Sequence, residues 1–242
     1  MGSYPFEVLY EDNHLLIVNK PAGLLSQGDI TGDMTLGDYA KAYIKEKYDK
    51  QGDVFLGVPH RLDRPVSGAI ILTRTSKALE RVAGMFRERE IQKIYWAVVR
   101  HKPQKQHGKI THWLVKDEKR NFVTAYNSPQ EGSQRAELSY RIMGELNEHY
   151  LLEVSPMTGR PHQIRVQLAA MGCPIRGDIK YGYSKPNPDG NIHLHSRRLY
   201  FLHPVRKTPL ICVAGLPKTE FWEQFLNLDD FEVKDKDLDH LY

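Results

Sequence analysis

The sequence predicts an α+β fold, with a mixed, mostly antiparallel sheet flanked by helices and loops. Between residues 93 and 154, short segments rich in β-branched and aromatic residues follow one another with brief turns, which is typical of antiparallel strands. Amphipathic helical patterns lie on both sides of this run, and no repeat or Gly/Ser-rich linker interrupts the 242 residues. We therefore expect one domain over residues 1–228, followed by an acidic tail at 229–242.

A hairpin and two helices are expected in the first third of the chain. Residues 7–10 and 15–19 are β-rich runs separated by a turn-forming Glu-Asp-Asn segment. From Thr35, a suitable N-cap, apolar residues recur at helical spacing, and a second pattern of this kind follows Ser76. Both segments should lay one face on the sheet.

The rest of the chain predicts further strands and two more helices. The strands of the central run are expected at residues 94–99, 109–114, 121–126, 136–142 and 150–154. A third helix is indicated by Pro161 near its start and Gly172 as its stop. Strands at 193–201 and 210–213 follow, and a last helix is expected after Pro217, with Phe221, Trp222, Phe225 and Leu226.

Composition favours an anionic partner. Lys and Arg number 34 against 30 Asp and Glu, a formal charge of +4, and acidic residues crowd the last fifteen positions, so the remainder is more basic. Cys173 and Cys212 do not make a disulfide framework in a chain of this length, which favours a reducing compartment such as the cytoplasm. Neither a secretory signal nor a membrane span is expected from the apolar runs.

The segment His60-Arg61-Leu62-Asp63-Arg64 is the first candidate for chemistry. It places one carboxylate between two guanidiniums just before the apolar run 69–72. Nearby positive charge favours the ionised carboxylate, so Asp63 is suited to act as a nucleophile, while the arginines can face a phosphodiester. A surface salt bridge in a loop is the competing interpretation.

A second cluster, Gly159-Arg160-Pro161-His162-Gln163-Ile164-Arg165, gathers cationic and polar donors at the start of the third helix. Such donors suit a phosphate or a carboxylate such as Asp63, although a solvated basic helix start is equally compatible. Tyr95 lies on a strand whose alternation gives Lys93, Tyr95 and Ala97 a common face, where it can stack on a base or accept a proton. A single strand tyrosine more often serves packing.

No metal or cofactor is expected. His193 and His195 share a strand face with Cys212 downstream, but paired cysteines or an acidic ligand at ligand spacing are missing. The motifs GxGxxG after a strand, GxxxxGK[ST], GxSxG and HExxH are absent from the sequence.

Taken in order, these motifs resemble the pseudouridine synthase family that modifies ribosomal large-subunit RNA and tRNA. The resemblance also covers Val18-Asn19-Lys20-Pro21-Ala22-Gly23, Lys93-x-Tyr95-x-Ala97-x-Val99, Pro174-Ile175-x-Gly177-Asp178-x-x-Tyr181-Gly182, and Leu194-His195 through His203-Pro204. It implies the catalytic fold of that family and an isomerase that converts a specific uridine to pseudouridine in rRNA or tRNA by base flipping. No small N-terminal RNA-binding domain is expected, and a monomer is the default.

The resemblance also implies residue roles. Asp63 is expected to be the nucleophile, at C6 of the base or C1′ of the ribose, with Arg165 as its salt-bridge partner and Tyr95 stacking on the uracil or helping to remove the C5 proton. Arg61 would fill the gap that the flipped base leaves. The remaining RNA contacts are expected from Lys20, Arg64, Arg160, His162 and Leu194.

Two other classes of function compete. A catalytically silent RNA-binding module would need the basic surface but not Asp63, Tyr95 and Arg165 together. A glycosidase-like hydrolase would pair Asp63 with Asp178, but the guanidiniums beside Asp63 favour its ionised form, which is the opposite of what an acid catalyst needs. The sequence does not indicate which RNA or which uridine is modified.

Overall fold

A computed structural model describes residues 3–28 and 32–226 of the chain. The chain is divided into two compact units. The first comprises residues up to 92 together with 196–217, and the second comprises residues 93–195 together with 218–226. The single domain expected for residues 1–228 stays a prediction, and the acidic tail at 229–242 lies outside the described residues.

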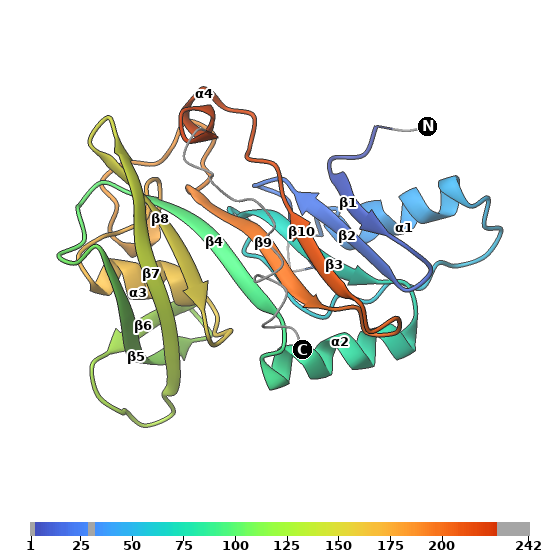
Figure 1. Cartoon of the computed structure of the whole chain (residues 1–242), viewed down its shortest axis with the longest axis horizontal. Helices are drawn as coiled ribbons and strands as arrows, with labels where there is room; N and C mark the ends of the chain where they lie inside the picture. Colours follow the sequence, from blue (N-terminus) through green and yellow to red (C-terminus); the bar gives the residue numbers. More distant parts are fainter. Residues whose placement is uncertain (1–2, 29–31, 227–242) are drawn as a thin grey trace. The chain divides into compact units, whose positions relative to one another are not determined.

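The first unit is built on a small sheet (Figure 1). Its strand order is β1-β2-β3-β9, β10 also pairs with β9, and the pairs β1/β2, β2/β3 and β9/β10 are antiparallel. The strands are β1 (Glu7–Glu11), β2 (Leu15–Lys20), β3 (Ser67–Thr73), β9 (Leu194–Leu202), which enters this unit at Ser196, and β10 (Pro209–Val213).

Two helices, α1 and α2, complete the described part of the first unit, as the sequence predicted. In α1 (Leu36–Lys47), the Thr35 side chain accepts from the Asp38 amide and the Asp38 side chain accepts from the Thr35 amide, a reciprocal cap that confirms the predicted start. The second helix, α2 (Ser76–Glu88), packs against β3 and buries Val82 in the core of the sheet. Leu15, Ile17, Ala69, Ile71, Leu199 and Phe201 form the strand side of that core.

Gly68 allows two backbones of the first unit to come into close contact. Its φ of +115° lies in a region that residues with a side chain rarely adopt, and a Cβ at this position would collide with the backbone of Ser196. The Ser196 hydroxyl donates to the Ala69 carbonyl at 3.0 Å, which fixes β9 against β3 at this point. The start of β3, which follows the loop that carries Asp63, is therefore held in place by β9.

We expect Gly68→Ala to lower the free energy of unfolding by more than about 2 kcal/mol, because backbone strain and overpacking add. Gly132→Ala is the matched control: Gly132 also has a positive φ, of +67°, but no atom lies within 4 Å of the added methyl group. Urea unfolding of both variants compares them. Equal losses would contradict the close contact as the cause.

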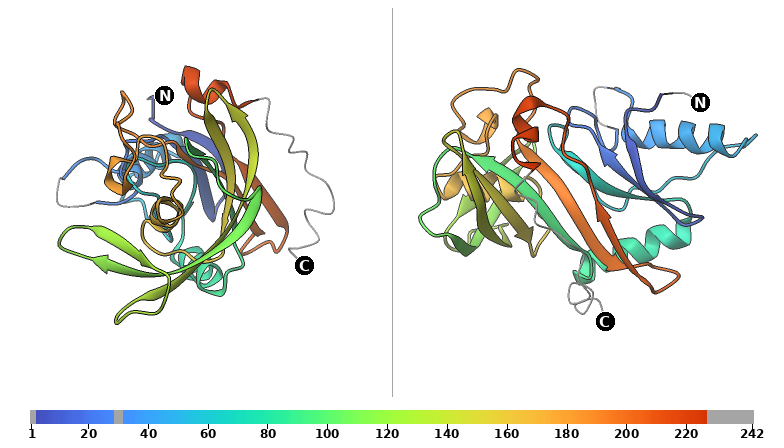
Figure 2. Two further views of the ribbon diagram at one scale, coloured as in Figure 1. Left: turned by 90° about the vertical axis from the view of Figure 1, so that its left-hand side faces the viewer. Right: turned by 45° about the horizontal axis from the view of Figure 1, so that its top comes forward.

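The second unit is built on a sheet with the strand order β4-β8-β7-β5-β6, in which every neighbouring pair is antiparallel (Figure 2). Its strands are β4 (Gln92–Val99), β5 (His107–Asp117), β6 (Phe122–Tyr126), β7 (Gln134–Leu146) and β8 (His149–Pro156). These are the consecutive strands that the sequence predicted, and the mostly antiparallel α+β fold class is confirmed.

Helices of the second unit are short. The predicted third helix is α3 (Gln163–Ala170), which packs against β5 and β6 and buries Val166 beside Leu114 and Val123. The predicted last helix is only α4 (Glu220–Glu223). The ring of Phe221 stacks on the ring of His193, with 4.4 Å between the ring centroids. Leu226 is exposed. No helix in the described part of the chain is long and apolar enough to span a membrane.

Candidate active site

The loop that carries Asp63 is fixed by a buried serine. The Ser26 hydroxyl donates to the Leu62 carbonyl at 2.8 Å and accepts from the Leu62 amide at 3.1 Å, and both residues are buried. The amide of Val66 donates to the Asp63 carbonyl at 3.0 Å and closes a turn. The chain is thus fixed at Leu62, just before Asp63, and by the turn just after it. Asp63 is half-buried, whereas Arg61 is exposed.

His60 secures the start of the same loop. Its Nε2 accepts from the amide of Ile71 at 2.8 Å, and its ring lies 4.4 Å from that of Phe86. A ring nitrogen that accepts from an amide carries no proton itself. We assign His60 a structural role, which joins the loop to β3 and α2.

Lys20 requires a correction. It was expected to contact RNA phosphate, but its side chain is completely buried, and its ammonium donates to the carbonyls of Pro21 at 2.9 Å, Leu24 at 2.7 Å and Arg64 at 3.4 Å. Burial lowers the pKa of Lys20 to about 7, while the negative charge of Asp63 acts in the opposite direction. An ammonium turned inward in this way cannot reach a phosphate on the surface. It lies close enough to Asp63 for the two charges to interact.

Arg64 is exposed and connects the loop that carries Asp63 to the segment around Gly23. Its Nε donates to the Gly23 carbonyl at 3.0 Å, its Nη2 pairs with Asp33 at 2.9 Å, and the Gly23 amide donates back to the Arg64 carbonyl at 2.8 Å. The motif around Lys20 and the Asp63 loop are therefore one structure, which explains why they occur together.

In the second unit, Tyr95 lies on β4 directly opposite Val154 of β8 and is 9% exposed. Leu194, predicted to form an apolar wall, is 3% exposed, and its amide donates to the Ile192 carbonyl at 2.9 Å. Both side chains are thus largely buried.

The Gly-Arg-Pro-His-Gln-Ile-Arg segment is organised by the side chain of Gln163. Its Oε1 accepts from the Thr158 hydroxyl at 2.8 Å and from the Arg160 amide at 3.0 Å, and its Nε2 donates to the Glu137 carbonyl at 2.9 Å. These bonds tie the start of α3 to the end of β8 and to β7, and they place Arg165 in the first turn of the helix, where it is 6% exposed.

Arg165 forms a bidentate pair with Asp178, a partner that the sequence reasoning did not assign. Nε lies 2.7 Å from one carboxylate oxygen and Nη2 lies 2.9 Å from the other, and Asp178 is 1% exposed. The guanidinium also lies over the ring of Tyr181, 5.1 Å from its centroid. Both oxygens of Asp178 therefore act as acceptors, which argues against the acid role that a glycosidase-like hydrolase would give it.

Tyr181 orients His162 as well. The amide of Val123 donates to the Tyr181 hydroxyl oxygen at 3.0 Å, and that oxygen lies 2.6 Å from Nδ1 of His162. The hydroxyl of Tyr181 and Nδ1 of His162 therefore share a short hydrogen bond, whose direction depends on the tautomer of the histidine. His162, in a left-handed conformation with φ of 51°, stays half-buried at the start of α3.

The histidines that resemble a zinc pair are used in packing. Nδ1 of His193 lies 3.0 Å from Nη1 of Arg176, which can only donate, and the pKa of His193 is lowered to about 3, by burial first and by Arg176 second. His195 is completely buried and its ring lies 5.9 Å from that of Trp222. Within the described residues, no group of three or more His, Cys, Asp or Glu is arranged to hold a metal ion.

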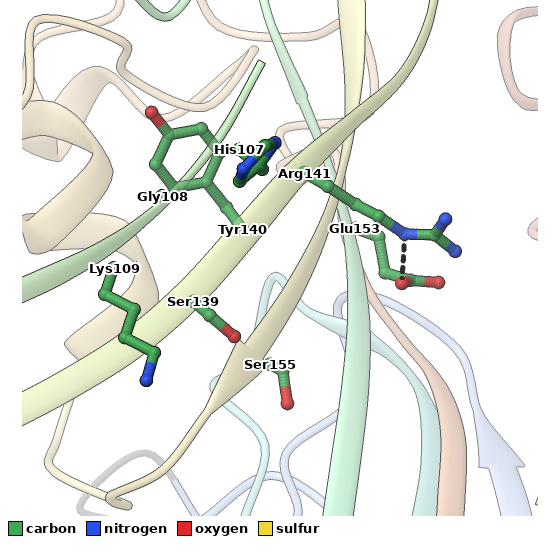
Figure 3. Close-up of a pocket in the computed structure, with 8 residues that line it drawn as sticks. All are labelled: His107, Gly108, Lys109, Ser139, Tyr140, Arg141, Glu153 and Ser155. Carbon is green, nitrogen blue, oxygen red and sulfur yellow. Dashed lines mark hydrogen bonds and ion pairs between the residues drawn. The ribbon is translucent and has the colours of Figure 1, made fainter. Parts of the chain in front are cut away.

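A shallow pocket of about 450 Å³ lies on the sheet of the second unit, and it contains none of the predicted site residues (Figure 3). It is lined by His107, Gly108, Lys109, Ser139, Tyr140, Arg141, Glu153 and Ser155. Ser139 pairs with Lys109 and with Ser155, one position away from the row that contains Tyr95 and Val154. Side chains alternate along strands, so Lys109 and the two serines occupy the face opposite to Tyr95.

The structure groups the predicted residues in two sets. The first unit holds Lys20, Arg61, Asp63 and Arg64, and the second holds Tyr95, Arg160, His162, Arg165 and Leu194. The first set offers a carboxylate on a rigid loop with cations beside it. The second set offers an aromatic platform and a buried guanidinium held by a carboxylate.

Comparison with known proteins identifies the family. A family model described as RNA pseudouridylate synthase matches residues 14–170, more than half of the chain, so the chain belongs to this family of RNA-modifying isomerases. It is 32% identical over 253 residues to pseudouridylate synthase RPUSD4, mitochondrial, of Xenopus tropicalis, covering 88% of this chain and 78% of the relative.

Bacterial relatives and solved structures agree. The chain is 31% identical to ribosomal large subunit pseudouridine synthase C of Rickettsia prowazekii, over 87% of this chain and 68% of that one. It is 28% identical to tRNA pseudouridine synthase C of Vibrio cholerae serotype O1, over 91% of this chain and 94% of that one. The structure of human RNA pseudouridylate synthase domain containing 4 has a TM-score of 0.74 at 25% identity and covers 93% of this chain and 94% of that chain. The pseudouridine synthase fold that the sequence predicted is therefore confirmed.

Proposed function

We propose that this isomerase converts a specific uridine to pseudouridine in ribosomal or transfer RNA, with Asp63 as the nucleophile on a uridine that has left its stack. The placement of Asp63 carries this proposal. Its carboxylate is half-buried on a loop fixed through Ser26, beside the inward ammonium of Lys20 and the exposed Arg61. A rigid anion next to a polyanion-binding surface suits attack on a nucleotide.

The reaction needs no net redox change. The carboxylate of Asp63 attacks C6 of the base or C1′ of the ribose, the N1–C1′ bond breaks, and a C5–C1′ bond forms after the uracil has rotated. The bond from Asp63 to C6 or C1′ then breaks, or is displaced as C5 bonds to C1′, which restores the free carboxylate. The C5 proton is lost and N1 gains a proton, so atoms and charge balance. Tyr95 stacks on the uracil or assists removal of the C5 proton, and both routes fit a buried aromatic side chain on a strand.

Arg165 is proposed as the counter-ion of Asp63. Its pairing with Asp178 uses two of the five N–H donors of a guanidinium and leaves the plane of the group fixed. A guanidinium fixed in this way can serve a second carboxylate without losing rotamer entropy. Asp178 is then a positioning residue, which acts through Arg165.

RNA contacts are assigned to the exposed arginines and to the start of α3. Arg61 is proposed to fill the gap left by the flipped base, and Arg64, Arg160 and His162 to contact phosphates, with Leu194 as the apolar wall of the uracil pocket. The cytoplasm is the proposed location, which the bacterial relatives support, although the relative from Xenopus tropicalis carries a mitochondrial name.

The test is conversion of defined RNA. We expect the purified protein, in buffer containing EDTA, to convert one or a few uridines in unmodified rRNA or tRNA transcripts, mapped by mass spectrometry of nuclease fragments. A silent RNA-binding module would bind the same transcripts without producing pseudouridine. Binding without conversion in every rRNA and tRNA of the host would overturn the proposed activity.

A further inference from the structure

Lys93 is a half-buried cation on the strand face that carries Tyr95. The two residues are two positions apart on β4, so their side chains leave the strand on the same side, roughly 7 Å apart along it. Burial lowers the pKa of Lys93, and no carboxylate or hydrogen bond in the described part of its unit acts in the opposite direction. Among the described residues of its unit, the ammonium therefore has no anionic partner.

The ammonium lies beside the Gly-Arg-Pro-His-Gln-Ile-Arg segment. A Cβ added to Gly159 would lie 3.7 Å from Nζ of Lys93 and would meet no other atom within 4 Å. Gly159 is exposed, and Arg160, which follows it, donates from Nε to the Arg135 carbonyl at 3.3 Å. The missing side chain at Gly159 thus leaves the space next to the ammonium open to an incoming group.

An unpaired cation that is half-buried costs folding free energy, since it has lost part of its hydration without gaining a partner. Such groups are found where a ligand supplies the missing charge. The open side at Gly159 and the second cation at Arg160 both favour an anion that arrives from solvent.

We propose that Lys93, with Gly159 as its open approach, binds a backbone phosphate of the RNA next to the target uridine. This inference rests on the proposed function, because it takes the base on Tyr95 to be the uridine that reacts. The spacing of about two strand residues between Tyr95 and Lys93 places the phosphate within one nucleotide of that base. Lys93 would thereby fix the position of the RNA chain relative to Tyr95 without taking part in the chemical reaction.

The test compares RNA affinity and its salt dependence in Lys93→Met and in the wild-type protein. We expect the Kd for the substrate RNA to rise roughly tenfold at low salt. The slope of log K against log salt should become shallower by about 0.7, because one phosphate contact is lost. The melting temperature should stay unchanged or rise, since the variant no longer buries an unpaired cation. Lys93→Arg should restore most of the affinity.

Two further variants sharpen the comparison. Gly159→Ala adds a methyl group without steric conflict, so it should fold normally and weaken RNA binding by obstructing the approach to Lys93. Lys109→Met removes a lysine from the opposite face of the same sheet and should leave affinity, slope and activity as in the wild type.

The outcomes separate this inference from the proposed function. If the wild type makes pseudouridine and Lys93→Met keeps its affinity and slope, the phosphate contact is wrong while the proposed function stands. A lower melting temperature with unchanged affinity would assign Lys93 a structural role and also overturn the inference. If the wild type binds RNA but makes no pseudouridine, the proposed function fails whatever Lys93 binds.

Discussion

Replacing Asp63 by asparagine is expected to lower the rate of pseudouridine formation by at least about 10⁴-fold, while the affinity for substrate RNA changes by less than about threefold. The amide keeps the size of the carboxylate and the fixed loop beneath it, but it is not a nucleophile. Single-turnover assays with end-labelled RNA measure the rate, and fluorescence anisotropy measures the affinity.

Asp53→Asn is the control, because it removes an exposed carboxylate from the same unit and should leave the rate unchanged. Intact-protein mass spectrometry must show that the asparagine at position 63 has not deamidated. Product formation by an intact Asp63→Asn protein at more than a small fraction of the wild-type rate would remove Asp63 from the nucleophilic role.

The second large effect is expected from the buried pair of Arg165 and Asp178. Asp178→Ala leaves a buried guanidinium without its bidentate partner, and breaking such a pair costs about 3–5 kcal/mol of unfolding free energy. The same change should abolish most of the activity, since Arg165 loses the carboxylate that fixes its plane. Urea unfolding and single-turnover assays measure the two effects.

The matched control is an exposed ion pair of the same unit. Arg100 and Glu148 are 2.8 Å apart with both side chains largely exposed, so Arg100→Ala should change the unfolding free energy by less than about 1 kcal/mol. Arg165→Lys should fail to restore full stability or activity, because one ammonium cannot form two parallel hydrogen bonds. A stable, active Asp178→Ala protein would show that another group holds Arg165.

Local patterns explain why much of the fold could be predicted. Strand alternation and short turns predict the strands of residues 93–154 and the hairpins β5/β6 and β7/β8, and the Thr35 cap depends only on neighbours three residues apart. The pairs β4/β8 and β5/β7 join strands that are not consecutive, so no local pattern indicates them. The last helix was expected to be longer than it is. Its apolar spacing is helical, but stacking of Phe221 on His193 replaces helix packing, and this contact cannot be read from sequence spacing.

The site was less predictable, because its partners are distant in the chain. Lysines are mostly exposed, so Lys20 was assigned to phosphate, and only the gathering of three backbone carbonyls around Nζ explains its burial. Asp178 follows Arg165 by thirteen positions through a turn, and no periodic pattern links them. The one signal in the sequence was the position of Asp178 and Tyr181 in a shared motif.

The most direct test of Asp63 as the nucleophile is a crystal structure of the Asp63→Asn protein bound to its substrate RNA. We predict that the target uridine has left its helix, that its uracil stacks on Tyr95, and that the side chain at position 63 lies within roughly 3.5 Å of C6 or C1′. Arg165 should contact the same side chain. A target uridine still stacked in its helix, or bound far from position 63, would contradict the proposed mechanism.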